Sequence, residues 1–244
     1  MKGIAPQAWP FLPFMTPAPS RPTPLSSESP AAADSASTPT GRAENAYDRS
    51  FWKAFLANSL VTVAVAVLYR YADFVSLLGG TELHLGWIVG IGMVGSLTMR
   101  LFVGTRIDHY GPRLVWLSAL ALLACVCFGH LLVMHYPGAN IRDPVVVAAC
   151  VGLRIAMWCA IAGIYASAMT FIASRVPVVR MAELLGMLGT SGFLGMILGV
   201  WVSDLLLSGE ADSAAAIERM FLAAGVLTLA AFASACWATA GYRH

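Results

Sequence analysis

The sequence predicts an all-α membrane protein in which six transmembrane helices form a single bundle. Hydrophobic residues make up 58% of the 244 residues and charged residues only 11%, whereas about a quarter of the residues of a soluble domain are charged. So little charge cannot cover a globule of this size with polar surface, which predicts a lipid bilayer as its surroundings. The formal net charge of +2 leaves no strongly basic face, so we expect no nucleic-acid partner.

The first 50 residues differ in composition from the rest. They hold nine of the 13 prolines, and Ser, Ala and Thr fill much of the remainder. Such a segment buries too little apolar area to offset its ordering entropy, and prolines interrupt its one short apolar stretch, which argues against a signal peptide. We therefore expect a disordered cytoplasmic tail over residues 1–50 and a helical bundle over residues 51–244.

Six apolar runs follow this tail. Each supplies the roughly 20 residues that a helix needs to cross the apolar core of a bilayer. Gly, Pro and charged residues separate the runs, and the period-2 alternation typical of barrel strands does not persist in them. The predicted spans are Trp52–Leu78, Gly86–Gly104, Leu114–His135, Pro144–Ala173, Ala182–Leu207 and Arg219–Ala240.

Basic residues predict how these spans are oriented, because cytoplasmic segments carry an excess of Lys and Arg. Three arginines, Arg70, Arg142 and Arg219, belong to one side of the predicted topology, and nine basic residues belong to the other. We therefore expect a multi-pass protein of the cell membrane, a bacterial inner or plasma membrane, with both termini in the cytoplasm. The nine residues are Arg42, Arg49, Lys53, Arg100, Arg106, Arg113, Arg175, Arg180 and Arg243.

The segment between the second and third spans reads G-x-x-x-D-x-x-G-x-R from Gly104 to Arg113. Gly104 allows close helix approach at the membrane edge, and Gly111 permits a tight turn between antiparallel helices. The Asp108 carboxylate can pair with an arginine or accept hydrogen bonds from a helix N-terminus. Arg113 can pair with Asp108 or with a lipid phosphate. An ordinary cytoplasmic loop would carry the same positive charge. The spacing of these residues is therefore informative only because the segment lies between the second and third spans.

On these residues the chain resembles the major facilitator superfamily, specifically its N-terminal six-helix half. The resemblance covers roughly Phe51–His244, and the chain departs from the family pattern at Pro112 and His109. It implies two inverted three-helix repeats and a cytoplasmic latch that forms and breaks as a transporter changes state. Asp108, Arg113 and Arg106 would then serve as gating residues.

Charged and polar residues inside the spans are candidates for a solute site. Arg154 lies ten residues after Pro144, about 15 Å into the membrane, where a charge is costly and should face the bundle interior or a wet cavity. The resemblance links an arginine in the fourth helix to substrate binding or proton coupling; a structural arginine bonded to backbone carbonyls and an acidic neighbour is the alternative. Arg70 and Asp73 are three residues apart and can pair on one helix face, and Asn58 is a further polar candidate.

Glycines mark expected packing faces in the second and fifth spans. The pairs Gly86/Gly90 and Gly195/Gly199 each form a G-x-x-x-G step, which allows two helix backbones to approach closely. We expect these faces to serve for packing, with sliding between helices as the alternative.

No catalytic, metal-binding or cofactor pattern is visible, so we expect neither an enzyme nor a bound metal or cofactor. Cys125 and Cys127, for example, point to different sides of a helix. A complete carrier of the resembled family has a second six-helix bundle, and this chain ends where the connecting linker would begin. We therefore expect half of a transporter for a small organic solute, completed by a missing C-terminal half or by homodimerisation. The alternative is a non-transporting six-span protein that binds or scaffolds a partner.

Overall fold

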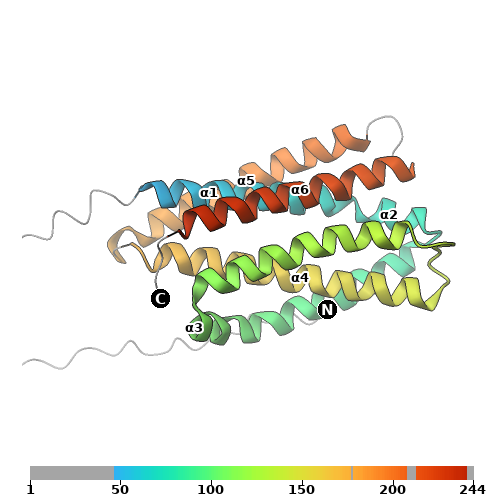
Figure 1. The fold of residues 1–244 in the computed structure, drawn as a ribbon, viewed down its shortest axis with the longest axis horizontal. Coiled ribbons are helices and arrows are strands. Elements are labelled where there is room, and N and C mark those ends of the chain that lie inside the picture. Colours follow the sequence, from blue (N-terminus) through green and yellow to red (C-terminus); the bar gives the residue numbers. More distant parts are fainter. Residues whose placement is uncertain (1–46, 177, 208–212, 241–244) are drawn as a thin grey trace, which may run out of the picture. The chain divides into compact units, whose positions relative to one another are not determined.

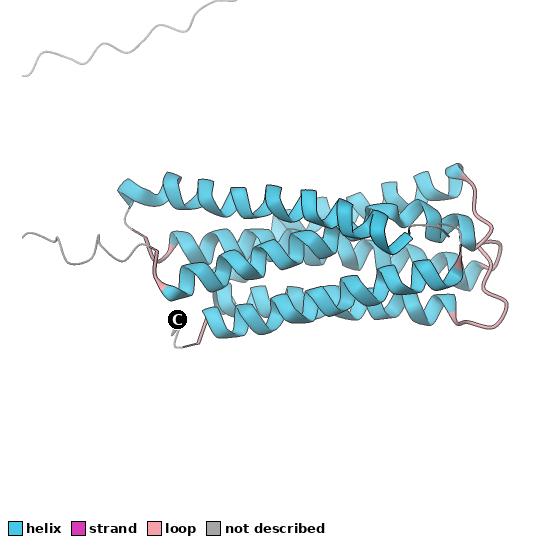
Figure 2. Cartoon of the chain, turned by 90° about the horizontal axis from the view of Figure 1, so that it is seen from above, coloured by secondary structure: helices cyan, strands magenta, loops and turns pink. Residues whose placement is uncertain are grey.

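The computed structural model describes residues 47–176, 178–207 and 213–240. All regular structure in these ranges is helical (Figures 1 and 2), so the all-α prediction is confirmed there. Nearly all of the predicted tail, residues 1–46, lies outside the described residues. The elements are α1 (Arg49–Val67), the 3₁₀ turn η1 (Leu68–Arg70), α2 (Tyr71–Leu77), α3 (Glu82–Met134), α4 (Pro144–Ala173), α5 (Val178–Leu207) and α6 (Ala214–Ala238).

Helix starts follow from local capping chemistry. The Asp48 carboxylate accepts a 2.7 Å hydrogen bond from the Phe51 backbone N–H and so caps α1. Asp143 and Ser213 cap α4 and α6 in the same manner, and Pro144 occupies the first helical position of α4. These side chains satisfy backbone donors that a helix N-terminus leaves unpaired, and proline at the first position has no N–H to lose.

The first predicted span is one continuous crossing made of α1, η1 and α2. Its 29 residues are about 43 Å long if helical throughout, and it tightens into a 3₁₀ turn at Leu68–Arg70. At its far end Gly79 adopts a φ of 76°, and the Ile141 N–H donates to the Leu78 carbonyl. This bond ties the α2–α3 connection to the α3–α4 connection.

Helix α3 departs most from the sequence-based prediction. It has 53 residues, about 80 Å if straight and far more than the roughly 30 Å of a bilayer core. Gly111 (φ 79°, ψ 154°) interrupts the helix, and the chain reverses its direction there (Figure 1). The second and third predicted spans are thus the two portions of α3, and the expected loop between them is helical up to Tyr110.

The Gly111–Pro112 pair explains this sharp reversal. Proline disfavours the helical conformation in the residue before it, and its fixed φ suits the first position of a new helix. The backbone of Gly111 lies in a region that residues with a Cβ rarely adopt. One residue therefore ends the first portion of α3 while the next begins the second, with almost no loop between them.

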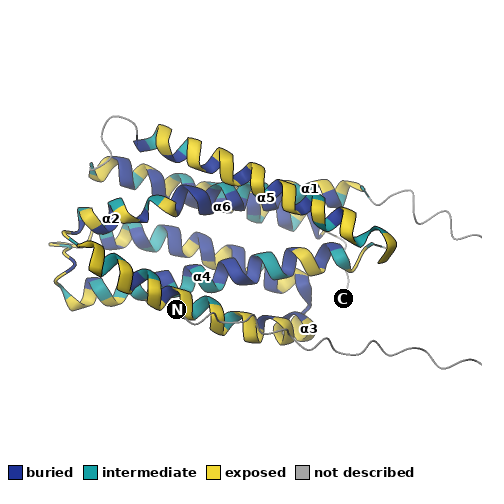
Figure 3. Cartoon of the chain, turned by 180° about the vertical axis from the view of Figure 1, so that it is seen from behind, coloured by how far each residue is buried: buried dark blue, intermediate teal, exposed yellow. Residues whose placement is uncertain are grey.

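The helices pack in an up-and-down arrangement. Helix α1 contacts both α5 and α6, while α3 contacts α4 and α6. Large buried side chains fill the contacts between helices, including Trp116, Phe74, Phe171 and Phe221. Figure 3 shows buried residues where helices face one another and many exposed residues along α5 and the first portion of α3.

Five helical segments have the length and composition of membrane spans: residues 49–77, 82–134, 144–173, 178–207 and 214–238. Each predicted span overlaps one of these five segments, and the second and third predicted spans both overlap residues 82–134. The start of α1, the turn of α3 and the end of α4 lie at one end of the bundle (Figure 1). This end, which we call the basic end, is the end that the distribution of arginines assigned to the cytoplasm.

Candidate functional site

Arg154 is the central residue of the candidate site. It lies on α4 and is only 7% exposed, as expected for a charge that avoids lipid. Side chains on helices point back towards the N-terminus, and the guanidinium carbon lies 4.2 Å from the centre of the Tyr71 ring. One guanidinium nitrogen donates to the Met157 sulfur at 3.6 Å. The structure thus brings α4 together with α2 through a cation–π contact.

Gly92 provides the space that Arg154 occupies. A Cβ atom at residue 92 would lie 2.7 Å from the Arg154 Cγ and 3.1 Å from Cδ1 of Trp158. A larger residue would therefore force the arginine to move. The sequence shows Gly92 only as one of several glycines in its span, so its specific role emerges from packing.

Four buried polar atoms near this arginine have no hydrogen-bond partner among the described residues. They are Arg154 Nε, Tyr71 Oη, His130 Nε2 and Trp158 Nε1. Tyr71 and His130 contact each other edge to face, with ring centroids 5.5 Å apart. Buried polar groups in native proteins are nearly always paired, so this concentration of unpartnered atoms around one cation marks a polar site inside the bundle.

The hydrogen bond made by His130 Nδ1 decides which ring nitrogen carries the proton. His130 Nδ1 lies 2.8 Å from the Val126 carbonyl oxygen, which can only accept, so Nδ1 carries the proton. In the neutral ring Nε2 is therefore an acceptor. Arg154 and Trp158 offer donors, and the Tyr71 hydroxyl can do either, so the site can bind both an anionic and a hydroxyl-bearing group.

Arg154 has no acidic partner within the described residues, since the ion pairs found there involve other arginines. Of the structural alternative, an arginine bonded to backbone carbonyls and an acidic neighbour, the described residues supply no acidic neighbour. A buried cation without a counter-charge costs free energy, and a bound anionic group would offset that cost.

Asn58 joins α1 to α5. Its amide nitrogen donates to Ser191 Oγ at 2.7 Å, and it is 4% exposed. One turn further along α1, Thr62 Oγ1 lies 3.3 Å from the Tyr165 hydroxyl on α4. These contacts form a polar line between α1, α4 and α5, and no local pattern in the sequence pairs Asn58 with Ser191 in particular.

Arg70 and Asp73 lie at the end of the bundle opposite the basic end. They form an ion pair of 2.7 Å, and Arg70 also contacts the Asp204 carboxylate at 3.3 Å. Asp204 belongs to α5, so the three charges join the first span to the fifth. Arg70 is 38% exposed, and the cluster shares helix α2 with the Arg154 site, because Tyr71 and Asp73 both belong to α2.

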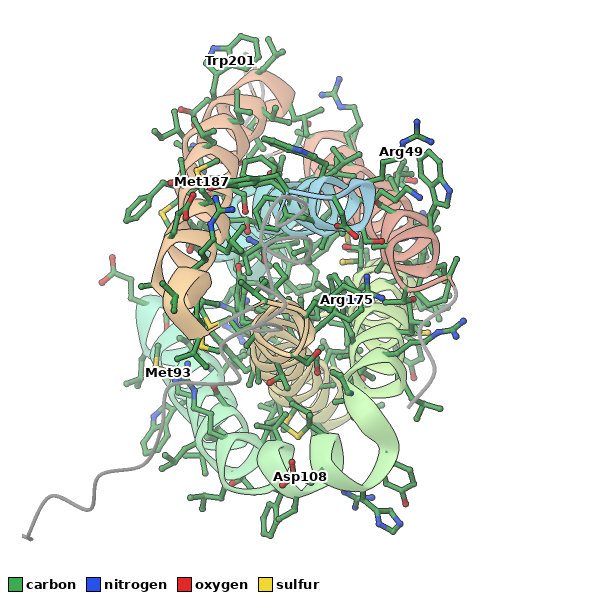
Figure 4. The ribbon with its side chains drawn as sticks, turned by 90° about the vertical axis from the view of Figure 1, so that its left-hand side faces the viewer. Arg49, Met93, Asp108, Arg175, Met187 and Trp201 are labelled. Carbon is green, nitrogen blue, oxygen red and sulfur yellow. The ribbon has the colours of Figure 1, made fainter. Side chains whose placement is uncertain are left out.

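The segment Gly104–Arg113 lies at the basic end. Asp108, Arg106 and Arg113 are all exposed, and among the described residues no ion pair joins them. Arg106 stacks 5.9 Å from the Tyr110 ring centre. Figure 4, which looks onto this end, places Asp108 at the edge of the bundle, well apart from Arg49. Gly104 is exposed, and a Cβ there would meet nothing within 4 Å.

A second set of polar contacts at the basic end escaped sequence reasoning. The Tyr47 hydroxyl donates to Glu183, which also accepts two 3.0 Å bonds from Arg180, and Arg175 lies 4.0 Å from Asp48. The hydrogen bond to Glu183 raises the pKa of the Tyr47 phenol above its ordinary value. These contacts hold the residues before α1 against the start of α5, and only the fold reveals them because the partners are far apart in sequence.

The two predicted glycine pairs have different surroundings. A Cβ at Gly195 would lie 2.8 Å from the Ser59 carbonyl oxygen, and one at Gly199 would lie 2.5 Å from the Ala66 Cβ, so both glycines allow α5 to approach α1 closely. A Cβ at Gly86 or Gly90 would meet nothing within 4 Å. Within the described residues, these two glycines therefore face open space.

Among the described residues, no group of three or more His, Cys, Asp or Glu side chains is arranged to hold a metal ion. The fold and the buried polar site instead define a helical, multi-pass membrane protein with a charged group inside its bundle.

Comparison with known protein families assigns this membrane protein to one of them. The sequence matches the Major Facilitator Superfamily over residues 15–243, so the chain belongs to this family. No curated protein and no solved structure matches it. The resemblance to this superfamily, though not to its N-terminal half in particular, is thereby confirmed, and the protein is a membrane transporter of this superfamily.

Proposed function

We propose that the chain forms the N-terminal half of a secondary transporter that moves a small organic solute by alternating access. The observation that carries the proposal is Arg154, a buried cation without an acidic partner among the described residues, surrounded by unpartnered polar atoms of Tyr71, His130 and Trp158. A solute that brings an anionic or hydroxyl group supplies the missing partners. A protein that only scaffolds has no need for this costly arrangement.

The proposed topology has six crossings with both termini in the cytoplasm. It is supported by the length of α3, which allows two crossings, and by the reversal at Gly111. The excess of arginines at the basic end supports the orientation. The six crossings would form two inverted three-helix repeats, with the solute site at their interface.

A second six-helix bundle completes the transporter in this proposal, either as a C-terminal half or as a second copy of the chain. Helix α5 and the first portion of α3 support the idea, because they carry large exposed apolar side chains such as Ile197, Trp201, Leu97 and Leu101. These side chains suit lipid and a second bundle equally, so the oligomeric state in lipid is a direct test. A strictly monomeric bundle that transports a solute would contradict this part of the proposal.

The segment Gly104–Arg113 would act as the cytoplasmic gate. Asp108, Arg106 and Arg113 have no ion-pair partner among the described residues, so their charges are available to groups on a second bundle. Forming such pairs in one state and breaking them in the other would bias the equilibrium between the two. Gly111 gives this segment a fixed turn on which the charges are held.

Flux through reconstituted vesicles tests the proposal. If a second copy of the chain completes the transporter, proteoliposomes containing only this chain should exchange members of a panel of small organic acids, alcohols and amines across the membrane, with protein-free vesicles as the baseline. An Arg142→Ala variant is the matched control, because Arg142 is exposed in the α3–α4 connection and should transport normally. If a correctly inserted, dimerisation-competent protein moves no member of the panel, the non-transporting alternative is favoured.

A further inference from the structure

Two grooves lie side by side at the turn of α3. One has a volume of about 570 Å³ and the other about 510 Å³, both within the roughly 300–1,000 Å³ range of small-molecule sites. They share Tyr110, Leu114 and Ser118 as a common wall. The turn at Gly111 creates this double groove, because it folds the two portions of α3 against each other with almost no loop.

The walls of both grooves are apolar along their length. The larger groove continues along Leu117 and Ala121 to Phe232 of α6, and the smaller one along Met99 and Phe102 to Cys159 of α4. Both run from the basic end towards the middle of the bundle, since these residues lie successively further from Gly111 along their helices. Their shape and chemistry suit hydrocarbon chains that enter from one membrane surface.

Each groove has one arginine on its wall near the turn. Arg113 lines the larger groove and Arg106 the smaller, while Tyr110 lies between them on the shared wall. Both arginines are exposed and have no ion-pair partner among the described residues. Asp108 is not among the residues that line either groove. The charge at the groove mouths is therefore positive.

From this geometry we propose that the turn of α3 binds an anionic phospholipid of the cytoplasmic leaflet. One acyl chain occupies each groove, and the phosphate contacts Arg106 and Arg113 above Tyr110. Charge complementarity selects this occupant, since two unpaired arginines favour an anionic headgroup, and the paired grooves match a lipid with two chains. A lipid held here would contact both sides of the hinge-like turn at Gly111.

Lipid retention on the purified chain tests the proposal. The protein is incubated with equal amounts of phosphatidylglycerol and phosphatidylcholine of identical acyl chains, and bound lipid is counted by native mass spectrometry. We expect selective retention of phosphatidylglycerol. In the double variant Arg106→Gln/Arg113→Gln its affinity should fall by roughly 25-fold, since each basic residue near an anionic surface contributes about fivefold. The double variant Arg49→Gln/Arg142→Gln removes the same charge away from the grooves and should bind normally.

A second variant tests the grooves themselves. Ser118 lies on the shared wall and is exposed, so Ser118→Phe should obstruct both grooves and reduce lipid retention while helix content measured by circular dichroism stays unchanged. Equal retention of both lipids, or unchanged binding in the Arg106/Arg113 variant, would overturn the proposal. It would also fail if the chain retained no lipid because a second bundle or the N-terminal segment covers the grooves.

Discussion

Arg154 and the arginines at the α3 turn are both cations without an acidic partner among the described residues, but their surroundings are opposite. Arg154 is 7% exposed and packs against aromatic rings and a thioether, whereas Arg106 and Arg113 are exposed at the basic end. An exposed unpaired arginine costs little because water or lipid headgroups solvate it. A buried one is retained against a free-energy cost, so the difference separates a candidate solute site from a candidate gate.

The largest expected effect comes from removing the interior cation. Arg154→Ala should lower transport by about 10- to 100-fold, because hydrogen bonds to a charged group contribute about 1.5–3 kcal/mol and each 1.4 kcal/mol is tenfold. Its thermal stability in detergent should stay equal or rise, since an uncompensated buried charge is lost. Flux and melting temperature are measured together, with Arg142→Ala as the control. A variant that merely fails to express would point to a structural role.

The turn of α3 should be most sensitive at its glycine. Gly111→Ala should destabilise the protein by about 1–3 kcal/mol, because the backbone at φ 79° and ψ 154° disfavours a Cβ atom. The matched control is Gly104→Ala, where a Cβ meets nothing within 4 Å and alanine favours the helix by about 1 kcal/mol. Unfolding in mixed micelles measures both. Equal stability of the two variants would contradict the account of the turn.

The carboxylate of the proposed gate should affect transport but not insertion. Asp108→Asn should slow flux by about tenfold, the scale of typical coupling free energies between conformational states. The neighbouring His109→Asn variant changes another exposed side chain of the same segment and should leave flux unchanged. Transport at the normal rate in Asp108→Asn would remove this residue from the gate.

The smallest effect is expected for the polar contact between α1 and α5. Asn58→Ala removes the hydrogen bond to Ser191 and should cost about 0.6 kcal/mol, the average for such bonds between membrane helices. Ser59→Ala is the control, because the Ser59 hydroxyl bonds only to the Phe55 carbonyl of its own helix. If the free energy of unfolding falls equally in both variants, the Asn58–Ser191 hydrogen bond does not stabilise the contact between α1 and α5.

Helices α1 and α5 show which features of the fold the sequence predicts and which it does not. Both were recognised as membrane spans from their apolar length. In the most apolar 18-residue stretch of each segment, however, 67% of residues are buried for the first span and 22% for α5. Apolar composition cannot distinguish a helix that faces other helices from one that faces lipid, because both surroundings are apolar. The glycine steps behaved similarly: Gly195 and Gly199 contact α1, while Gly86 and Gly90 face open space.

The candidate site was predicted in its central residue but not in its neighbours. A charge in the middle of an apolar run is visible in any sequence, so Arg154 was found. Tyr71, which is 2% exposed and contacts Arg154, was not among the predicted site residues. His130, which contacts Tyr71, was not among them either. Neither position carries a local signal, because their partners come from other helices.

The sequence by itself determined that this protein is a helical membrane transporter of the Major Facilitator Superfamily, since hydropathy and the spacing from Gly104 to Arg113 are local properties of the chain. It also determined the turn, because a Gly-Pro pair constrains its own backbone wherever it occurs. Only the tertiary structure decided that Arg154 contacts Tyr71 and has no acidic partner among the described residues, that Asp204 joins Arg70, and that Tyr47 bonds to Glu183. Such pairings depend on helix rotation and depth, which packing against neighbouring helices sets.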